Sequence, residues 1–161
     1  MALPHDLIEV KGNQDMKSMN RQTINMSSTR RRPEEGDICI IGGNHVGHNI
    51  ANRLATRGTS ITHIDPIPPS DPPPDLTVHE VVSLDATALV DADLSEKTTV
   101  LVVQPKDRTN LLMAQLARTQ YDVSRIIARV NDPRRVVAFD DIGIETVDAS
   151  AALGRVISER L

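Results

Sequence analysis

The strongest constraint on the fold is a regular alternation of short apolar strands with helices, which begins near residue 37. Apolar runs rich in Val and Ile predict strands at residues 37–42, 60–64, 77–83, 98–104, 124–130 and 144–147. Helix signals predict helices between most of these runs and after the last, at residues 45–57, 84–94, 107–119, 132–140 and 149–161. Apolar strands joined by helical crossovers are typical of a parallel sheet covered on both faces. The pattern predicts an α/β fold: a Rossmann-like, doubly wound sheet of six strands in three α/β/α layers, in order 3-2-1-4-5-6.

Local signals place the predicted helices more closely. Val46, Ile50 and Leu54 recur every four residues and predict the buried face of the first helix. Gly58 is the expected C-cap of that helix, and Asp107 the expected N-cap of the helix over residues 107–119.

The second crossover has a different composition. Residues 66–75 read PIPPSDPPPD and hold six of the ten prolines of the chain. Proline lacks a backbone donor and restricts the residue before it, so this segment predicts an extended connector in place of a helix. A docking segment for a proline-binding module is the alternative.

Composition excludes several classes of protein. One Phe, one Tyr and no Trp leave no aromatic platform for single-stranded nucleic acid, and a net charge of −4 gives no general attraction for phosphate polymers. A single cysteine, Cys39, allows neither an intrachain disulfide nor a zinc site built on cysteines. No apolar run approaches the roughly 18 residues of a membrane span, and no signal peptide is recognisable, so we expect a cytoplasmic protein.

Residues 1–35 lack any sustained period and end in Arg30, Arg31 and Arg32, which predicts a disordered N-terminal tail ahead of a domain over residues 36–161. The arginine triplet is either a solvated linker or an arm for an anionic partner.

A glycine-rich motif joins the first strand to the first helix. It matches the first and third glycines of the dinucleotide-binding fingerprint G-x-G-x-x-G. The first permits a sharp turn, the third lets the helix pack close to the sheet, and the helix N-terminus offers N–H groups to a pyrophosphate. The second glycine is replaced by asparagine, whose side chain occupies space near the expected phosphates. The predicted cofactor-binding residues are Gly42, Gly43, Asn44, His45, Val46 and Gly47.

Asp65 ends the second strand, about 20 residues beyond the motif, where the fingerprint expects a carboxylate for the ribose hydroxyls. An acidic residue there favours NAD over NADP. The alternative is that Asp65 caps the turn ahead of Pro66.

Four segments carry a resemblance to a known family. They are Asp85-Ala86-Thr87 (preceded by Leu84 where the family has glycine), residues 107–118 (DRTNLLMAQLAR), residues 126–133 (IIARVNDP) and residues 142–148 (IGIETVD). Over about residues 37–161 the chain resembles the N-terminal lobe of RCK domains (regulator of potassium conductance), also called the TrkA N-terminal domain.

The resemblance implies a regulatory module for potassium or other cation transport, not an enzyme, with NAD or NADH, or else ADP or ATP, in the glycine-loop crevice. Asp65 would hold the ribose, and Asp85 and Ala86 would lie near the adenine. His45 stands where members that respond to ATP often have arginine, which favours NAD or ADP. Arg129 and Asn131 replace the acidic calcium ligands of some channel relatives, so no metal site is expected.

The family also forms dimers, often assembled into rings on a membrane channel or transporter. Leu111, Leu112, Met113 and Leu116 give the helix over residues 107–119 more apolar positions than one face needs, consistent with a homodimer contact or with burial against the sheet alone. Because no spanning segment is predicted, the membrane partner is expected to be a separate polypeptide, so that the module acts in trans.

Two other functions remain open. An NAD-dependent oxidoreductase needs a substrate domain and a general acid or base, for which His48 and His63 qualify by residue type only. A structural dimer without a ligand is the other alternative, motivated by Asn44 and the proline connector.

Overall fold

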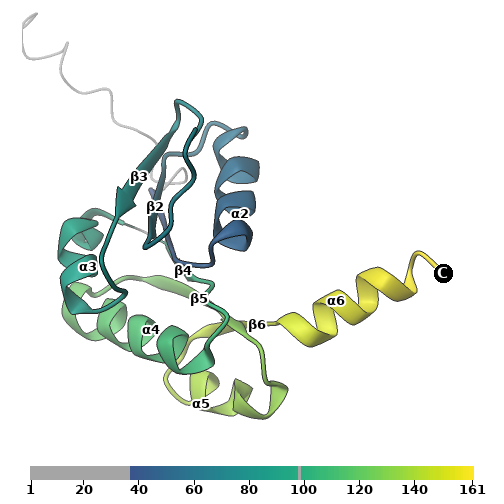
Figure 1. Cartoon of the computed structure of the whole chain (residues 1–161). Coiled ribbons are helices and arrows are strands. Elements are labelled where there is room, and N and C mark those ends of the chain that lie inside the picture. Colours follow the sequence, from purple (N-terminus) through teal and green to yellow (C-terminus); the bar gives the residue numbers. More distant parts are fainter. Residues whose placement is uncertain (1–36, 98) are drawn as a thin grey trace, which may run out of the picture. The chain divides into compact units, whose positions relative to one another are not determined.

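A computed structural model describes residues 37–161 except Thr98, so the predicted tail lies outside the described residues. The strands are β1 (Ile38–Ile41), β2 (Ile61–Asp65), β3 (Leu76–Glu80), β4 (Thr99–Val102), β5 (Arg125–Val130) and β6 (Glu145–Asp148). The α-helices are α2 (His45–Ala55), α3 (Ala86–Asp91), α4 (Asp107–Tyr121), α5 (Val136–Asp140) and α6 (Ala149–Ser158), with short 3₁₀ turns η1 (Leu94–Glu96) and η2 (Pro133–Arg135) (Figure 1).

All neighbouring strands are parallel, and their order is β3-β2-β1-β4-β5-β6, which confirms the predicted doubly wound sheet. Ile41, at the end of β1, pairs with Ile64 of β2 and Val102 of β4. The direction of winding reverses between β1 and β4, and ligands of such sheets bind outside the strand ends at this switch point.

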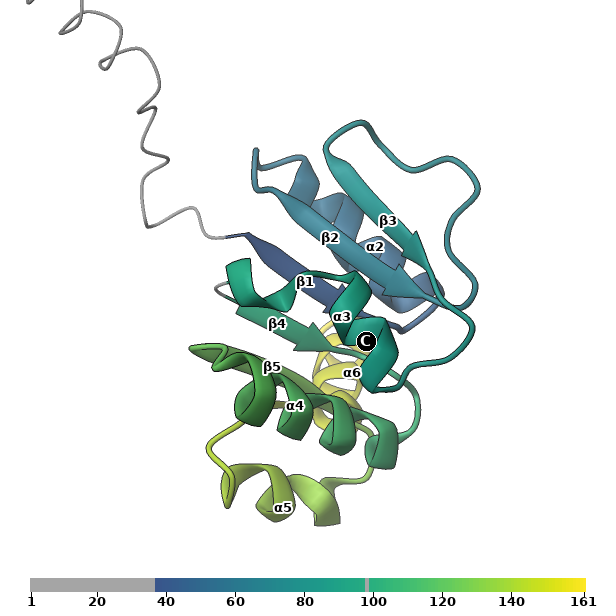
Figure 2. The ribbon, with the colours of Figure 1, turned by 90° about the vertical axis from the view of Figure 1, so that its left-hand side faces the viewer.

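Helices lie on both faces of the sheet (Figure 2). On one face, Leu89 of α3, Met113 of α4 and Phe139 of α5 pack with β-strand residues in one aliphatic core cluster. On the other face, Ala51 and Ala55 of α2 pack against Ile40, Ile61 and Leu76. The three predicted layers are therefore present.

On the α2 face, helix cover stops short of β4–β6. Side chains alternate along a strand, and the residues of β5 that point away from α4, among them Ile127, are only half-buried. Helix α6 extends away from the end of β6 (Figure 1), and none of its residues is buried. We call the part of the α2 face over β4–β6 the bare half-face.

Three local expectations need correction. The buried stripe of α2 is Gly47, Ala51 and Ala55, while the side chain of Val46 is 44% exposed. The C-cap of α2 is Thr56, with Gly58 in the following turn. Lys106 caps α4, and Asp107 is its first helical residue.

Residues 66–75 contain no helix or strand, as their prolines predict. Within residues 37–161, no helix combines the length and the apolar character needed to cross a bilayer.

The position of α2 depends on Gly47. A Cβ added there would overlap the carbonyl oxygen of Gly42 and would lie 2.8 Å from Nε2 of His63. The absence of a side chain is therefore what lets α2 approach the sheet, as the fingerprint predicts for its third glycine.

We expect Gly47→Ala to lower the free energy of unfolding by about 2 kcal/mol or more, because the methyl group meets backbone that cannot move aside. Gly154→Ala in α6 is the matched control, because nothing lies within 4 Å of its added Cβ. That change should raise stability by about 0.5–1 kcal/mol through helix propensity. Urea denaturation measures both, and equal midpoints for Gly47→Ala and the wild type would contradict the packing argument.

Candidate functional site

The glycine loop, residues 42–47, turns the chain from β1 into α2 with three consecutive residues at positive φ. These are Gly42 (φ 70°), Gly43 (φ 93°) and Asn44 (φ 48°). With ψ at −124°, Asn44 has the backbone shape of the first central residue of a type II′ turn, which strongly favours glycine. Asn44 therefore occupies the position of the second glycine of the fingerprint and adopts a backbone conformation that favours glycine.

Two backbone donors of the loop lack an acceptor among the described residues, one on the buried Gly43 and one on the exposed His45. The N–H groups of Val46 and Gly47 both donate to the carbonyl of Gly43. Those of Gly43 and His45 have no acceptor among the described residues. An N–H group without a partner at the N-terminus of a helix is a feature of anion-binding sites, because the helix dipole also favours negative charge there.

Asp65 connects this loop to the segment that follows β2. Its Oδ2 accepts from the N–H of Asn44 at 2.9 Å, and its Oδ1 accepts from the N–H of Ile67 at 2.8 Å. The structure therefore brings Asp65 to the glycine loop, and it also forms the turn cap given as the alternative. The carboxylate is fully buried, so a ribose hydroxyl does not reach it in this conformation.

His63 lies beneath the loop and is also fully buried. Its Nε2 is 3.1 Å from the carbonyl oxygen of Gly42 and 3.7 Å from Oδ2 of Asp65. A carbonyl only accepts, so Nε2 carries the proton. Burial lowers the pKa of His63, although the hydrogen bond to Gly42 and the charge of Asp65 oppose that effect. A buried, neutral imidazole engaged with backbone is poorly placed for acid–base chemistry on a substrate.

His48, the other histidine considered by type, lies one turn into α2. Its Nε2 accepts from the side-chain amide of Asn52 at 3.1 Å. This contact orients the ring along the helix.

Gln104 belongs to the site, although sequence reasoning missed it. A Cβ added to Gly42 would fall on the side-chain amide of Gln104, which therefore lies against the glycine loop. Gln104 lies two residues beyond the end of β4, and the predicted strand order already places the end of β4 beside β1. That order was the available signal, because the local sequence around Gln104 contains none.

Asn110 fixes the backbone of Gln104. The fully buried Asn110 side chain accepts from the N–H of Gln104 at 2.8 Å and donates to the carbonyls of Gln104 and Arg129, each at 2.8 Å. One amide side chain of α4 thus holds the ends of β4 and β5 together.

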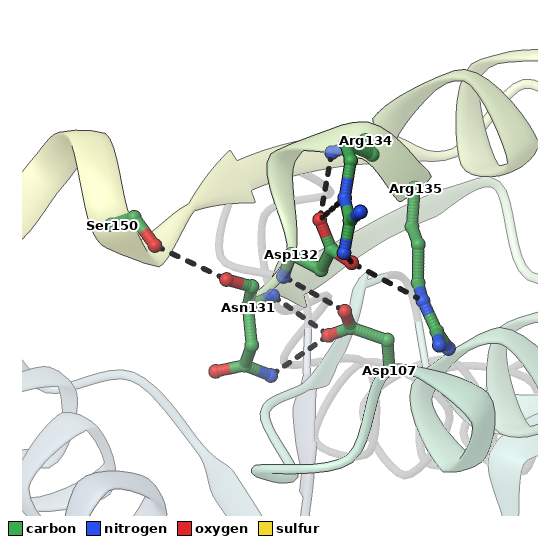
Figure 3. A network of polar contacts seen from close by, with 6 residues as sticks. All are labelled: Asp107, Asn131, Asp132, Arg134, Arg135 and Ser150. Atoms are coloured by element: carbon green, nitrogen blue, oxygen red, sulfur yellow. Dashed lines mark hydrogen bonds and ion pairs between the residues drawn. The ribbon is translucent and has the colours of Figure 1, made fainter.

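Asp107 adds a second connection between the same elements (Figure 3). Its carboxylate accepts from the backbone N–H of Asn131 at 2.7 Å, from the side-chain amide of Asn131 at 2.8 Å and from the N–H of Asp132 at 2.9 Å. Burial raises the pKa of Asp107, but these hydrogen bonds and the charge of Arg135 outweigh it and lower that pKa overall. The DRTN and RVND segments are therefore complementary halves of one polar network.

The same network extends to α6. Ser150 donates to the carbonyl of Asn131 at 3.1 Å, and Asp132 pairs with the guanidinium of Arg134 at 2.8 Å (Figure 3). Within the described part of the chain, no three acidic, histidine or cysteine side chains gather in a way that could hold a metal ion.

A hollow of about 360 Å³ opens beside the N-terminus of α2. It is lined by Asn44, His45, His48 and residues 67–70, and we call it the loop–connector hollow. Asp85, predicted near the adenine, lines a different hollow of about 280 Å³ with Glu80 and Ser83.

Asp85 caps α3. Its Oδ1 accepts from the N–H of Thr87 at 2.9 Å, and the hydroxyl of Ser83 donates to its Oδ2 at 2.6 Å. Neither Asp85 nor its neighbour Ala86 is among the residues that line the loop–connector hollow.

Comparison with known proteins gives a family and named relatives. The TrkA-N domain matches residues 38–148. A Trk system potassium uptake protein TrkA homolog from Methanothermobacter thermautotrophicus is 31% identical over 120 residues, covering 68% of this chain and 52% of that protein. TrkA from Mycobacterium tuberculosis is 28% identical over 107 residues, covering 65% and 49%. The chain thus spans about half the length of the curated relatives it matches.

Solved structures agree on the fold. The crystal structure of GsuK bound to ADP is 27% identical, with a TM-score of 0.63, and the match covers 82% of this chain and 35% of that one. The NAD(P)-binding domain of an exopolyphosphatase-related protein from Archaeoglobus fulgidus is 19% identical, with a TM-score of 0.63, covering 78% and 96%. The GsuK channel bound to NAD is 17% identical, with a TM-score of 0.61, covering 88% and 27%. At such low identity the last two establish the fold alone.

The buried His63 predicts a pH dependence of stability. Its pKa is lowered in the folded protein, so between that pKa and the ordinary value of 6.5 the unfolded chain binds more protons. The contribution of the neutral His63 to the free energy of unfolding is therefore fully present above about pH 6.5 and is lost as the pH falls below that value. Thermal melts from pH 7.5 to pH 5 should show this loss, and His63→Gln should flatten it. The exposed His45, changed to Gln, is the control that should keep the wild-type slope; a wild-type slope in His63→Gln would contradict the assignment.

Proposed function

Because the chain belongs to the TrkA-N domain family, we propose that it is a nucleotide-binding regulatory module for potassium or other cation transport. The observation that carries the proposal is the glycine loop, in which the N–H of the exposed His45 has no acceptor among the described residues and lies at the N-terminus of α2 beside the loop–connector hollow. Relatives named as potassium uptake proteins and the similar GsuK structure bound to ADP support it. The module corresponds to residues 36–161 of the chain.

The ligand class is an adenosine diphosphate moiety, as in NAD, NADH or ADP. The diphosphate binds along residues 42–47, where the helix dipole and free donors favour negative charge. Asp65 holds the ribose, and Asp85 and Ala86 approach the adenine. ATP is a weaker candidate, because the imidazole of His45 offers less to a γ-phosphate than the permanently charged guanidinium of an arginine.

The module regulates and does not catalyse. His63 is buried beneath the loop and His48 is bonded to Asn52, so neither is presented as a general acid or base to a bound nicotinamide. Ligand binding acts by favouring one conformation over another, and a separate cytoplasm-facing membrane transporter or channel responds to that change. The protein therefore works in the cytoplasm, in trans.

The working form is a homodimer or a ring of dimers. Leu153, Val156 and Ile157 follow helical spacing along α6, and their side chains are 61%, 46% and 51% exposed. In the dimer, the apolar stripe of α6 from one copy packs on the bare half-face of the sheet of the other copy, which lacks helix cover. Leu112 of α4, which is 47% exposed, adds to the apolar surface available to a partner.

A ligand-free scaffold of the same fold is the second candidate. The buried state of Asp65 and the Asn44 side chain beside the hollow favour it. Direct binding measurements decide between the two functions.

We expect millimolar NAD, NADH or ADP to raise the melting temperature, with a gain of about 2.7 kcal/mol when the ligand stands at about 100 times its Kd. His45→Asp should weaken calorimetric binding about tenfold or more, because its carboxylate repels the diphosphate at close range. Asn49→Asp is the matched control, with the same added charge one turn along α2 on an exposed side chain. A melting temperature unmoved by any of these nucleotides would favour the scaffold.

The oligomer gives a separate test. Sedimentation velocity at micromolar concentration should show a dimer for the wild type and a monomer for Ile157→Glu, since a charge on the apolar stripe of α6 cannot be buried in an interface unpaired. Ala151→Glu, on the opposite side of the same helix, should leave the dimer intact. A monomeric wild type would count against the interface.

A further inference from the structure

The two oxygens of the Asp65 carboxylate have different partners. Its Oδ2 accepts from the N–H of Asn44 and lies 3.7 Å from Nε2 of His63, so this oxygen is committed to the interior. Its Oδ1 accepts from the N–H of Ile67 at 2.8 Å. The second contact ties the start of the proline connector, residues 66–75, to the end of β2.

The connector also covers this oxygen. Residues 67–70 form one wall of the loop–connector hollow, with Asn44, His45 and His48 opposite. Asp65 is not among the lining residues, and it is fully buried. A ribose hydroxyl in the hollow can therefore reach Oδ1 only if it displaces the N–H of Ile67.

Apolar burial in this wall is partial, because Pro68 and Pro69 are half-buried. The side chain of Ile67 is 73% exposed, so it contributes almost no packing. The adjacent prolines provide no backbone donors, which leaves the N–H of Ile67 as the contact with Asp65. A single hydrogen bond of this kind contributes little net free energy and is exchangeable with a ligand that offers its own donor.

We propose that residues 67–70 are a lid, latched to Asp65 by the N–H of Ile67, that is released when a ribose hydroxyl of the bound nucleotide takes over Oδ1. This inference rests on the proposed nucleotide-binding function and adds a regulatory movement to that site. Since the closed lid hides the ribose contact, the apparent affinity is reduced by the fraction of molecules that are open. The position of residues 67–70, next to the N-terminus of α2, therefore depends on whether a nucleotide is bound.

Two substitutions at one position separate the latch from the side chain. Ile67→Pro removes the N–H donor and continues the proline run on both sides, whereas Ile67→Ala keeps the donor and removes the side chain. Isothermal titration with NAD and with ADP should show binding tightened about threefold to tenfold in Ile67→Pro, the factor expected for one net hydrogen bond. Ile67→Ala, which keeps the N–H donor, should not show this tightening. Equal affinities in Ile67→Pro and the wild type would overturn the lid.

Hydrogen exchange of the wild-type protein tests the movement without any variant. Pro66, Pro68 and Pro69 have no N–H, so a peptide over residues 66–70 reports only Ile67 and Ser70. Adding NAD or ADP should slow exchange in the glycine loop and accelerate it at Ile67.

The outcomes of this exchange experiment are distinguishable. If the glycine loop becomes protected while Ile67 exchanges at its original rate or more slowly, the nucleotide-binding function stands and the lid is overturned. If neither segment responds and titration detects no binding, both proposals fall together.

Discussion

The hydrogen bond from the N–H of Asn44 to the buried carboxylate of Asp65 is the contact on which the geometry of the site depends. A buried carboxylate is costly unless donors surround it, so the glycine loop must point a backbone N–H inward at this place. That requirement explains why Asn44 keeps a backbone shape that favours glycine, with φ at 48° and ψ at −124°. The cost of this conformation is offset by the hydrogen bond that it makes to the buried carboxylate.

Polar side chains hold the two sides of the switch point by different means. On the β1–β2 side, His63 and Asp65 fix the carbonyl of Gly42 and the N–H of Asn44 from below. On the β4–β5 side, Asn110 and Asp107 clamp the strand ends through backbone groups of neighbouring segments. Gln104 is thereby held against Gly42 across the switch point. Hydrogen bonds to buried side chains fix the backbone on both sides of the switch point, and the proposed lid lies outside them, in the proline connector.

The sequence predicts the periodic features of this structure well and the long-range ones poorly. Strand order and the roles of Gly42 and Gly47 follow from the alternation of elements and from the glycine spacing, which are local signals. The N-cap prediction for Asp107 fails because a local rule cannot see Asn131, whose donors compete for the same carboxylate. The buried stripe of α2 shifts by one residue from the predicted face because Gly47 sets how closely the helix approaches the sheet.

The burial of Asp65 could not be read from the sequence, because it depends on the path of a connector that has no hydrophobic period. The same feature favours a regulator over an enzyme. An enzyme gains from a site shaped in advance for its transition state, whereas a regulator needs two states of similar free energy that a ligand distinguishes. A carboxylate that accepts either from Ile67 or from a ribose provides two such states with one exchanged hydrogen bond. Because Oδ2 keeps its bond to Asn44 in both, the exchange moves the connector while the glycine loop stays in place.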